Sequence, residues 1–450
     1  MKGLFGMKKK IPLLLSFIII VGIFGGMNNS INALQTFKAG EGATASSSQE
    51  SISENTVVIY TFNEEFKNLF DDYYVPTHDM NFEVEFVLTP SYDNEYINTL
   101  DSALINQSSN EMKLDIFIAE PDYVNKYINS PYVKNLTELG LTGRDLSRQF
   151  PYALEMATSE DGEIKAAAWN AEPGAFIYRR SVAQSCLGTD DPAEVEKMIS
   201  DWDKFEQTAE KITANSDCYM VYSPEDIYRL CTQSRTTPWV QNGVVTVDSK
   251  LKDWADMCKS LYEKGCISKN TMWSLEWSNA SSVFGYFGAP WFAYYVLSYF
   301  DNAVSGDWAC CRPTESYYWG GCFICAAEGS DSDKEVLDII RFFTADASSM
   351  LNLAEGHTDY PNNRIAATQL IRSDTYSSIN EFYNYQPINA VFSIEGESIT
   401  LEPQTSYDFE LDSLFITAMK DYIFGIISYD TALANFYTLA IEAFPSLTIS

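Results

Sequence analysis

Runs of apolar residues divide the first part of the chain into strand-sized and helix-sized segments. Three short runs rich in β-branched and aromatic residues, at 56–62, 82–88 and 114–120, predict buried strands. Segments 64–70 and 94–107 lie between them and have the pattern of helices. Because helix-sized crossovers join parallel strands, this block predicts a parallel α/β sheet that helices cover on both faces.

A second block of mixed segments begins after 164–180. Helices are predicted at 200–216, where Ser200 or Asp201 supplies the N-cap, and at 248–266, 332–346, 412–425 and 429–444. Strands are predicted at 321–328 and at the start of 281–300, which becomes helical after Pro290. The sequence has no internal repeat of fixed period, so the pattern predicts two α/β lobes.

Residues 1–30 have the pattern of a signal or anchor segment. Three lysines at 8–10 precede the apolar run 11–26, which is at the short end for a membrane-spanning helix. A small polar leader at 31–55 is expected to be flexible. The sequence after it has no second long apolar run, so we expect an exported protein with a soluble body. Met27 stands where a lipoprotein would carry its lipidated cysteine, and cleaved release and membrane tethering both remain open.

The net charge narrows the range of partners. The 450 residues carry a formal charge of -32, and the basic N-terminus leaves the body more acidic still. Such a surface repels nucleic acid and anionic lipid. We therefore expect no nucleic-acid partner and a neutral or cationic ligand. Aromatic residues make up 14% of the chain, a high share that leaves rings for roles beyond the core.

Motifs for catalysis and for metal binding are largely missing. The sequence has two histidines, His78 and His357, and it lacks zincin spacing, a nucleophile elbow, a phosphate loop and a dinucleotide fingerprint. Cys322 and Cys325 form a CxxC pair inside a strand-like run with no second pair nearby, which favours small buried hydrophobic residues. We expect no cofactor and no metal. A Cys–His nucleophile and a glycosidase built on two carboxylates remain open.

Aromatic residues recur beside glycine, proline, asparagine or an acid just after the predicted strands. These segments contain Tyr60 with Asn63 and Glu64, Glu120 with Asp122, Trp169 with Glu172, Gly288 with Trp291, Gly306 with Trp308, and Tyr317 to Gly321. Ligands of open α/β sheets bind outside the carboxyl ends of the strands. Aromatic planes there accept the apolar faces of sugar rings, while nearby acids and amides accept the hydroxyls. For each single tryptophan, packing in the core is the competing interpretation, and we assign Trp202, Trp239 and Trp254 to packing.

Four segments, taken in order and spacing, resemble a known family. They are 166–180 (AAAWNAEPGAFIYRR), 283–292 (VFGYFGAPWF), 306–324 (GDWACCRPTESYYWGGCFI) and 429–436 (YDTALANF). Together they resemble the extracellular family 1 solute-binding proteins of bacterial carbohydrate ABC transporters, which are similar to maltose-binding protein. The resemblance implies an α/β, two-lobe periplasmic-binding-protein type II fold. Each lobe would be a mainly parallel sheet flanked by helices, with the ligand cleft between lobes. The first lobe would comprise 56–168 and 320–385, and the second 169–319 and 386–450.

The resemblance also implies site residues and a function. Trp291 would stack on a sugar ring, Glu172 and Asp122 would accept sugar hydroxyls, and Glu64 would add a polar contact. Trp169, Trp308, Tyr318 and Trp319 would line the cleft. The protein would be a monomer that captures an oligosaccharide by closing its lobes and delivers it to membrane permease subunits, without enzymatic activity. A peptide or cationic solute, a secreted carbohydrate hydrolase, and an adhesin or sensor role remain alternatives.

Overall fold

The first three predicted strands form one sheet with the predicted direction. The computed structural model describes residues 56–91, 94–110, 112–357, 360–373 and 381–449. In it, β1 (Thr56–Thr61) pairs in parallel with β2 (Glu83–Leu88) and β3 (Ile116–Ala119). Strands β10 (Phe323–Ala326) and β4 (Ala166–Ala168) complete the order β2-β1-β3-β10-β4, and β10 runs antiparallel to both of its neighbours. We call the part of the molecule built on this sheet the first lobe.

The second lobe is built on a three-stranded sheet whose direction differs from the prediction. Strand β5 (Ala175–Arg179) lies between β8 (Gly285–Gly288) and β9 (Trp308–Cys311) and is antiparallel to both. The expectation of a mainly parallel sheet in each lobe is therefore wrong for this lobe. Several helices separate β5 from β8 along the chain. A connection of that length can return to either end of a strand, so helix-sized segments do not fix the direction of pairing here.

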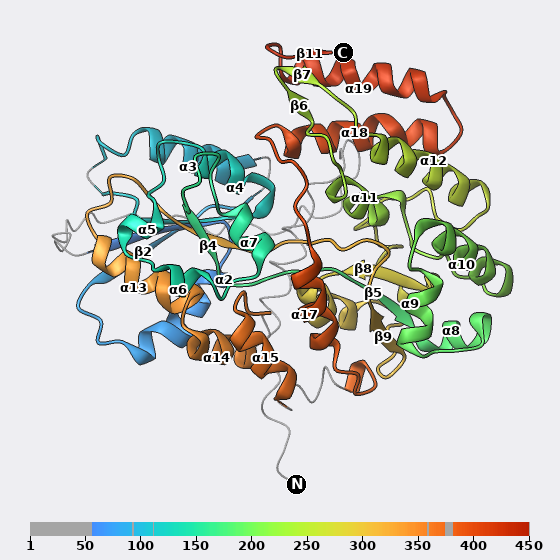
Figure 1. Cartoon of the computed structure of the whole chain (residues 1–450), viewed down its shortest axis with the longest axis horizontal. Coiled ribbons are helices and arrows are strands. Elements are labelled where there is room, and N and C mark those ends of the chain that lie inside the picture. The colour runs from blue at the N-terminus through green and yellow to red at the C-terminus, as the bar shows by residue number, and fades with distance from the viewer. Residues whose placement is uncertain (1–55, 92–93, 111, 358–359, 374–380, 450) are drawn as a thin grey trace, which may run out of the picture.

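Helices pack around both sheets, and the two lobes lie side by side (Figure 1). In chain order the helices are α2 (Glu65–Leu69), α3 (Glu95–Ile105), α4 (Pro121–Ile128), α5 (Leu136–Leu139), α6 (Gly143–Leu146), α7 (Pro151–Met156), α8 (Arg180–Leu187), α9 (Pro192–Met198), α10 (Trp202–Asn215), α11 (Pro224–Gln233), α12 (Ser249–Glu263), α13 (Asp333–Thr344), α14 (Ala347–His357), α15 (Arg364–Arg372), α17 (Ile388–Ser398), α18 (Asp408–Ile423) and α19 (Tyr429–Ala443). The six long helices that the pattern predicted are thus confirmed as α3, α10, α12, α13, α18 and α19. Asp201 is the N-cap of α10, where its side chain accepts a hydrogen bond from the Lys204 N–H.

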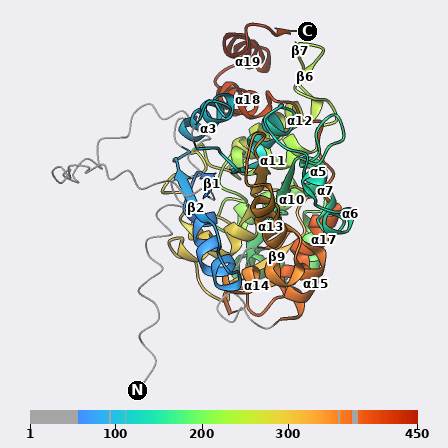
Figure 2. The same cartoon turned by 90° about the vertical axis from the view of Figure 1, so that its left-hand side faces the viewer.

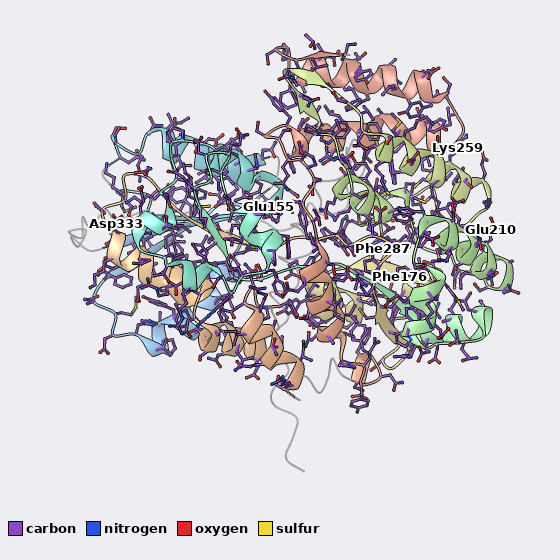
Figure 3. All side chains as sticks on the ribbon, viewed as in Figure 1. Glu155, Phe176, Glu210, Lys259, Phe287 and Asp333 are labelled. Atoms are coloured by element: carbon purple, nitrogen blue, oxygen red, sulfur yellow. The ribbon has the colours of Figure 1, made fainter. Side chains whose placement is uncertain are left out.

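A small third sheet lies beside the C-terminal helices, at one end of the folded molecule. Strands β6 (Val240–Gln241), β7 (Val244–Val245) and β11 (Thr448–Ile449) form it in the order β11-β7-β6. Helices α18 and α19 lie at this end, and α14 and α15 lie at the opposite end (Figure 2). The core of the second lobe is aromatic: the rings of Phe176 on β5 and Phe287 on β8 lie 5.1 Å apart, well inside the lobe (Figure 3).

Two of the segments that carry the chain between the lobes pair with each other. One joins β4 to β5 (169–174), and the other joins β9 to β10 (312–322). The Gly174 N–H donates to the Tyr317 carbonyl at 2.7 Å, and the Trp319 N–H donates to the Glu172 carbonyl at 2.8 Å. A Cβ on Gly174 would lie only 1.9 Å from the Tyr317 ring, so this close approach requires glycine. Paired crossing segments of this kind can serve as a hinge.

The double glycine after the Tyr-Tyr-Trp run turns the second crossing segment into β10. Gly320 and Gly321 have φ values of 90° and 112°, which lie in the region that favours glycine. All nine cysteines are free thiols, and Cys322 and Cys325 of the CxxC pair are buried. In the part of the chain that the structure describes, no helix is long and apolar enough to cross a membrane. The predicted signal segment and polar leader lie outside the described residues.

Candidate functional site

A cavity of about 120 Å³ lies between the two lobes, and we call it the cleft pocket. From the first lobe, its wall is formed by the turn after β1, the start of α3 and the turn between β3 and α4. From the second lobe, it is formed by α11, the loop that holds Trp273 and the turn after β8. The two crossing segments, with Glu172 and Trp319, and Phe409 of α18 also line it. A ligand in this pocket would therefore touch both lobes and the segments that join them.

Three tryptophans from separate parts of the second lobe and its crossing segment form an aromatic cluster in the pocket. The ring of Trp291 meets that of Trp319 edge to face, with centroids 4.7 Å apart. Trp273 lies nearly parallel to Trp291, at 6.1 Å and 17°. The Trp291 Nε1 donates to the Trp319 carbonyl at 2.7 Å, which fixes the orientation of the Trp291 ring. Aromatic surface held this firmly is the usual lining of a small-molecule site.

Trp273 has an unusual backbone conformation for a large residue. Its φ is 68°, in the left-handed region that bulky side chains rarely occupy. Its ring also packs on Trp277, with centroids 4.5 Å apart, which helps to hold this conformation. Strained backbone of this kind is concentrated at ligand-binding and switch segments. The loop around Trp273 is thus shaped to place an indole over the pocket.

Glu172 connects the aromatic cluster to the first crossing segment. It is buried, and its carboxylate accepts hydrogen bonds from the Asn170 side-chain amide and from the Trp291 backbone N–H, both at 3.2 Å. Its own N–H donates to the Tyr152 hydroxyl at 3.0 Å. The carboxylate therefore holds the turn after β8 in position while it also faces the pocket.

A group of acids faces one guanidinium across the pocket. Glu65, Glu120 and Asp122 come from the first lobe, and Arg229 comes from α11 of the second lobe. Burial, and next the charges of Asp122 and Glu65, raise the pKa of Glu120 to about 8, against the opposing effect of Arg229. The Arg229 guanidinium also lies over the ring of Trp319, 5.4 Å from its centroid. Among the residues that the structure describes, the wall of the cleft pocket thus has more carboxylates than cationic groups.

Four of the eight residues that the sequence suggested for the site come together in the cleft pocket: Trp291, Glu172, Asp122 and Trp319. Tyr318 lies in a second, adjoining cavity of about 60 Å³, which we call the side pocket. Its hydroxyl donates to Glu402 Oε1 at 3.1 Å, and its ring stacks on that of Tyr152 at 5.7 Å. The aromatics before the double glycine therefore line two neighbouring cavities.

The other three suggested residues line neither pocket. Glu64 is exposed and precedes the first turn of α2, while the next residue, Glu65, lines the cleft pocket. Trp169 is buried against Phe66, with ring centroids 5.2 Å apart. Trp308 is buried in β9 and stacks on Phe382. These two tryptophans take part in packing within the described structure.

The structure adds residues that the sequence analysis did not select. Trp273 lies in 271–278 (TMWSLEWS), where two tryptophans among polar residues give the same kind of signal as the chosen segments. Glu120 was noted with Asp122 in the sequence, but only Asp122 was selected for the site. Arg229 is one cation within a helix, and nothing in its local sequence distinguishes it from a solvated arginine.

Comparison with known proteins identifies the fold. No family model matches the sequence, and no curated protein does so. Among solved structures, an extracellular solute-binding protein of family 1 is similar, with a TM-score of 0.72 and 20% identity over 86% of this chain and 99% of that one. The sugar-binding protein MalE from Xanthomonas citri gives a TM-score of 0.67 at 12% identity, over 87% of this chain and 97% of that one.

Two similar structures contain bound disaccharides. The galacto-N-biose/lacto-N-biose I-binding protein of an ABC transporter from Bifidobacterium longum, in complex with lacto-N-biose, has a TM-score of 0.66 at 14% identity, over 88% of this chain and 98% of that one. An ABC transporter-associated binding protein from B. animalis subsp. lactis, in complex with β-1,6-galactobiose, has a TM-score of 0.62 at 16% identity, over 88% and 99%. The chain thus has the two-lobe type II fold of the extracellular solute-binding proteins, and the predicted α/β two-lobe fold is confirmed, apart from the strand direction in the second lobe.

Proposed function

We propose that this protein is an extracytoplasmic carbohydrate-binding protein that delivers an oligosaccharide to an ABC importer. The observation that carries the proposal is the cluster of Trp273, Trp291 and Trp319 in a pocket between the lobes. Indole planes fit the apolar faces of sugar rings, and the surrounding carboxylates and Arg229 fit their hydroxyls. Proteins of the same fold that bind lacto-N-biose and β-1,6-galactobiose add support.

The proposed mechanism is capture by closure. The ligand would stack on the tryptophans of the second lobe, and its hydroxyls would donate hydrogen bonds to the acids of the first lobe. Contact with both lobes would stabilise the closed form, with 169–174 and 312–322 as the hinge. Each stacked ring would contribute roughly 1 kcal/mol beyond its buried area. A few stacks and hydroxyl contacts would give roughly micromolar affinity, or about -8 kcal/mol.

The partners and the organisation of the chain follow from the same proposal. The closed form would present a surface of both lobes to membrane permease subunits, and the protein would act as an exported monomer outside the cytoplasmic membrane. The first lobe would comprise 56–168 and 320–385, and the second 169–319 and 386–450. Glu172, Asp122, Trp291 and Trp319 would contact the ligand, together with Trp273.

A tryptophan-fluorescence titration of the protein with mono- and oligosaccharides tests the proposal. We expect saturable quenching or a spectral shift with at least one oligosaccharide, recovered intact afterwards. The absence of a response to every sugar in a broad panel would overturn carbohydrate binding. Trp291→Ala serves as the site variant and Trp202→Phe as the matched control, because Trp202 packs against Phe205 and Phe287 instead of lining a pocket.

A carbohydrate hydrolase is the second candidate function, and the carboxylates of the cleft pocket favour it. Glu120 has a pKa of about 8 and lies near the charges of Asp122 and Glu65. A protonated acid beside an ionised one is the arrangement that glycosidases use. Chromatography of the sugars after incubation separates the two functions, because only the hydrolase yields shorter products.

A further inference from the structure

The side pocket adjoins the cleft pocket. Both cavities share Pro121, Asp122, Arg229 and Phe409 in their walls. The side pocket has a volume of about 60 Å³. One water needs about 10–15 Å³ of such space, so the cavity can hold a small polar group that projects from a ligand in the cleft pocket.

Glu402 supplies the side pocket with an acceptor that the protein does not satisfy. Its side chain is 9% exposed, and Oε1 accepts hydrogen bonds from the Tyr318 hydroxyl at 3.1 Å and from the Gln404 amide at 3.4 Å. Oε2 is buried and has no hydrogen-bond partner among the described residues. A buried carboxylate oxygen without a donor is costly, and a ligand donor would remove that cost.

Several donors in the wall of the side pocket already donate to acceptors within the protein. Tyr228 and Thr232 donate to Asp412 Oδ1 at 2.5 and 2.9 Å, and Thr405 donates to Asp408. The Gln404 amide donates to the Tyr318 hydroxyl at 3.0 Å. The groups of the wall that could bind a ligand are mostly carboxylate oxygens, which are hydrogen-bond acceptors. A ligand hydroxyl brings an acceptor as well as a donor, whereas an ammonium brings donors alone and matches this wall better.

The charges around the side pocket favour the same group. Asp122, Glu402, Asp408 and Asp412 line it together with Arg229. Behind the wall, the Arg235 guanidinium donates to Asp408 Oδ2 at 2.8 Å and is nearly inaccessible to solvent. Four carboxylates therefore face two guanidinium groups, and a single added positive charge would bring the group closer to neutrality.

We infer that the side pocket receives a protonated primary amine of the ligand, so that the ligand is an oligosaccharide with at least one free amino group. The inference rests on the proposed carbohydrate-binding function and names the sugar class. The ring of the amino sugar would stack in the cleft pocket, and its ammonium would pass Asp122 to reach Glu402 and Asp412. Burial raises the pKa of Glu402 to about 7 against the opposing effect of Arg235, as expected for a carboxylate that lacks its cation.

Calorimetric titration of the full protein with three β-1,4-linked disaccharides of one shape tests the inference. The probes are the glucosamine disaccharide with free amines, its N-acetylated form and the neutral glucose disaccharide. We expect the free amine to bind about tenfold or more tightly than the other two, as a charge-assisted contact predicts. Equal or weaker binding of the free amine would overturn the inference and leave the proposed function standing.

Substituted variants of the protein test whether the side pocket causes the preference for the free amine. Glu402→Gln is expected to lose the preference for the amine while it retains binding of the neutral disaccharide. Glu263→Gln, an exposed glutamate on α12, is expected to keep the preference. A preference that survives in Glu402→Gln would place the amine elsewhere and overturn the assignment of the side pocket. If Glu402→Gln does not fold, the comparison of the three sugars on the unmodified protein still decides whether the amine is recognised.

A fourth probe separates failure of the inference from failure of the function. Binding of the polyamine spermidine, with no response to any saccharide, would overturn both the proposed function and the amino-sugar class. Binding of neutral sugars alone would overturn only the inference.

Discussion

Trp291 and Trp319 hold each other in place at the junction of the lobes. The Trp291 Nε1 donates to the Trp319 carbonyl at 2.7 Å, and the two rings meet at 74° with centroids 4.7 Å apart. Trp291 follows β8, whereas Trp319 lies in the crossing segment that leads to β10. A Cβ on Gly320 would approach Trp291 Nε1 to 3.2 Å, so the glycine also makes room for the indole. The aromatic cluster and the crossing segment 312–322 are therefore joined by one contact.

Substitutions at Trp291 are expected to lower sugar affinity in steps. Trp291→Ala removes the stacking surface and should weaken binding of an oligosaccharide about tenfold, close to the 0.5–1.5 kcal/mol measured for aromatic pairs elsewhere. Trp291→Phe keeps a ring but loses the N–H to Trp319, and it should give an intermediate loss. Isothermal calorimetry measures both. Unchanged affinity in Trp291→Ala would remove this indole from the binding site.

Two substitutions at Trp273 separate the strained backbone from the ring. Trp273→Ala and Trp273→Gly remove the same indole, but only glycine relaxes the φ of 68°. The glycine variant should be more stable than the alanine variant by about 1 kcal/mol, because alanine retains the left-handed penalty. Both variants should bind sugar more weakly than the unmodified protein. Urea unfolding and calorimetry provide the two measurements, and equal stability of the two variants would argue against backbone strain.

The pattern of apolar residues predicted the strands of the first lobe well, because strand and helix formation depends largely on the spacing of apolar residues within a short segment. The runs at 56–62, 82–88 and 114–120 became β1, β2 and β3, and the helix-sized segments between them set parallel pairing. Capping residues such as Asp201 marked where a helix begins. The antiparallel sheet of the second lobe was not predictable in this way, because a long connection leaves the direction of its strands open.

The site could be predicted only in part, because tertiary structure decides which way a side chain faces. Trp169, Trp291 and Trp308 all lie near strand ends in similar sequence, yet only Trp291 lines the cleft pocket. Glu64 and Glu65 are adjacent, and the start of α2 exposes one and buries the other. Arg229 reaches the pocket from the side of α11, and no local signal accompanies it. The residue types in the sequence indicated the chemistry of the site. Which of these residues line the pocket could be learned only from the folded structure.

Trp308 should matter for stability and not for binding. Its ring lies 6.3 Å from that of Phe382 at an angle of 8° and is almost fully buried in β9. Trp308→Phe is expected to lower the free energy of unfolding by roughly 1–3 kcal/mol, because it leaves part of a packed volume empty. The dissociation constant for an oligosaccharide should stay the same. A large loss of affinity with unchanged stability would instead place Trp308 at the ligand.

Glu120 should make the ligand-free protein less stable as the pH rises. Its pKa is about 8 in the folded protein and 4.5 in an unperturbed glutamate, so the folded state holds this proton more tightly than the unfolded chain. Between these two values the unfolded chain has released the proton that the folded protein still retains. The contribution of Glu120 to stability is therefore present below about pH 4.5, is lost progressively as the pH rises towards 8, and is gone above that.

Glu120→Gln removes this titration and is expected to flatten the pH dependence. The variant and the unmodified protein should have similar melting temperatures at pH 5, whereas the variant should melt at the higher temperature at pH 9. Other shifted groups, such as Glu402, titrate in both proteins and cancel in the comparison. Glu263→Gln, an exposed position, is the control and should follow the unmodified protein. Parallel curves for Glu120→Gln and the unmodified protein from pH 5 to 9 would show that neither burial nor the charges of Asp122 and Glu65 raise the pKa of Glu120 in the folded protein.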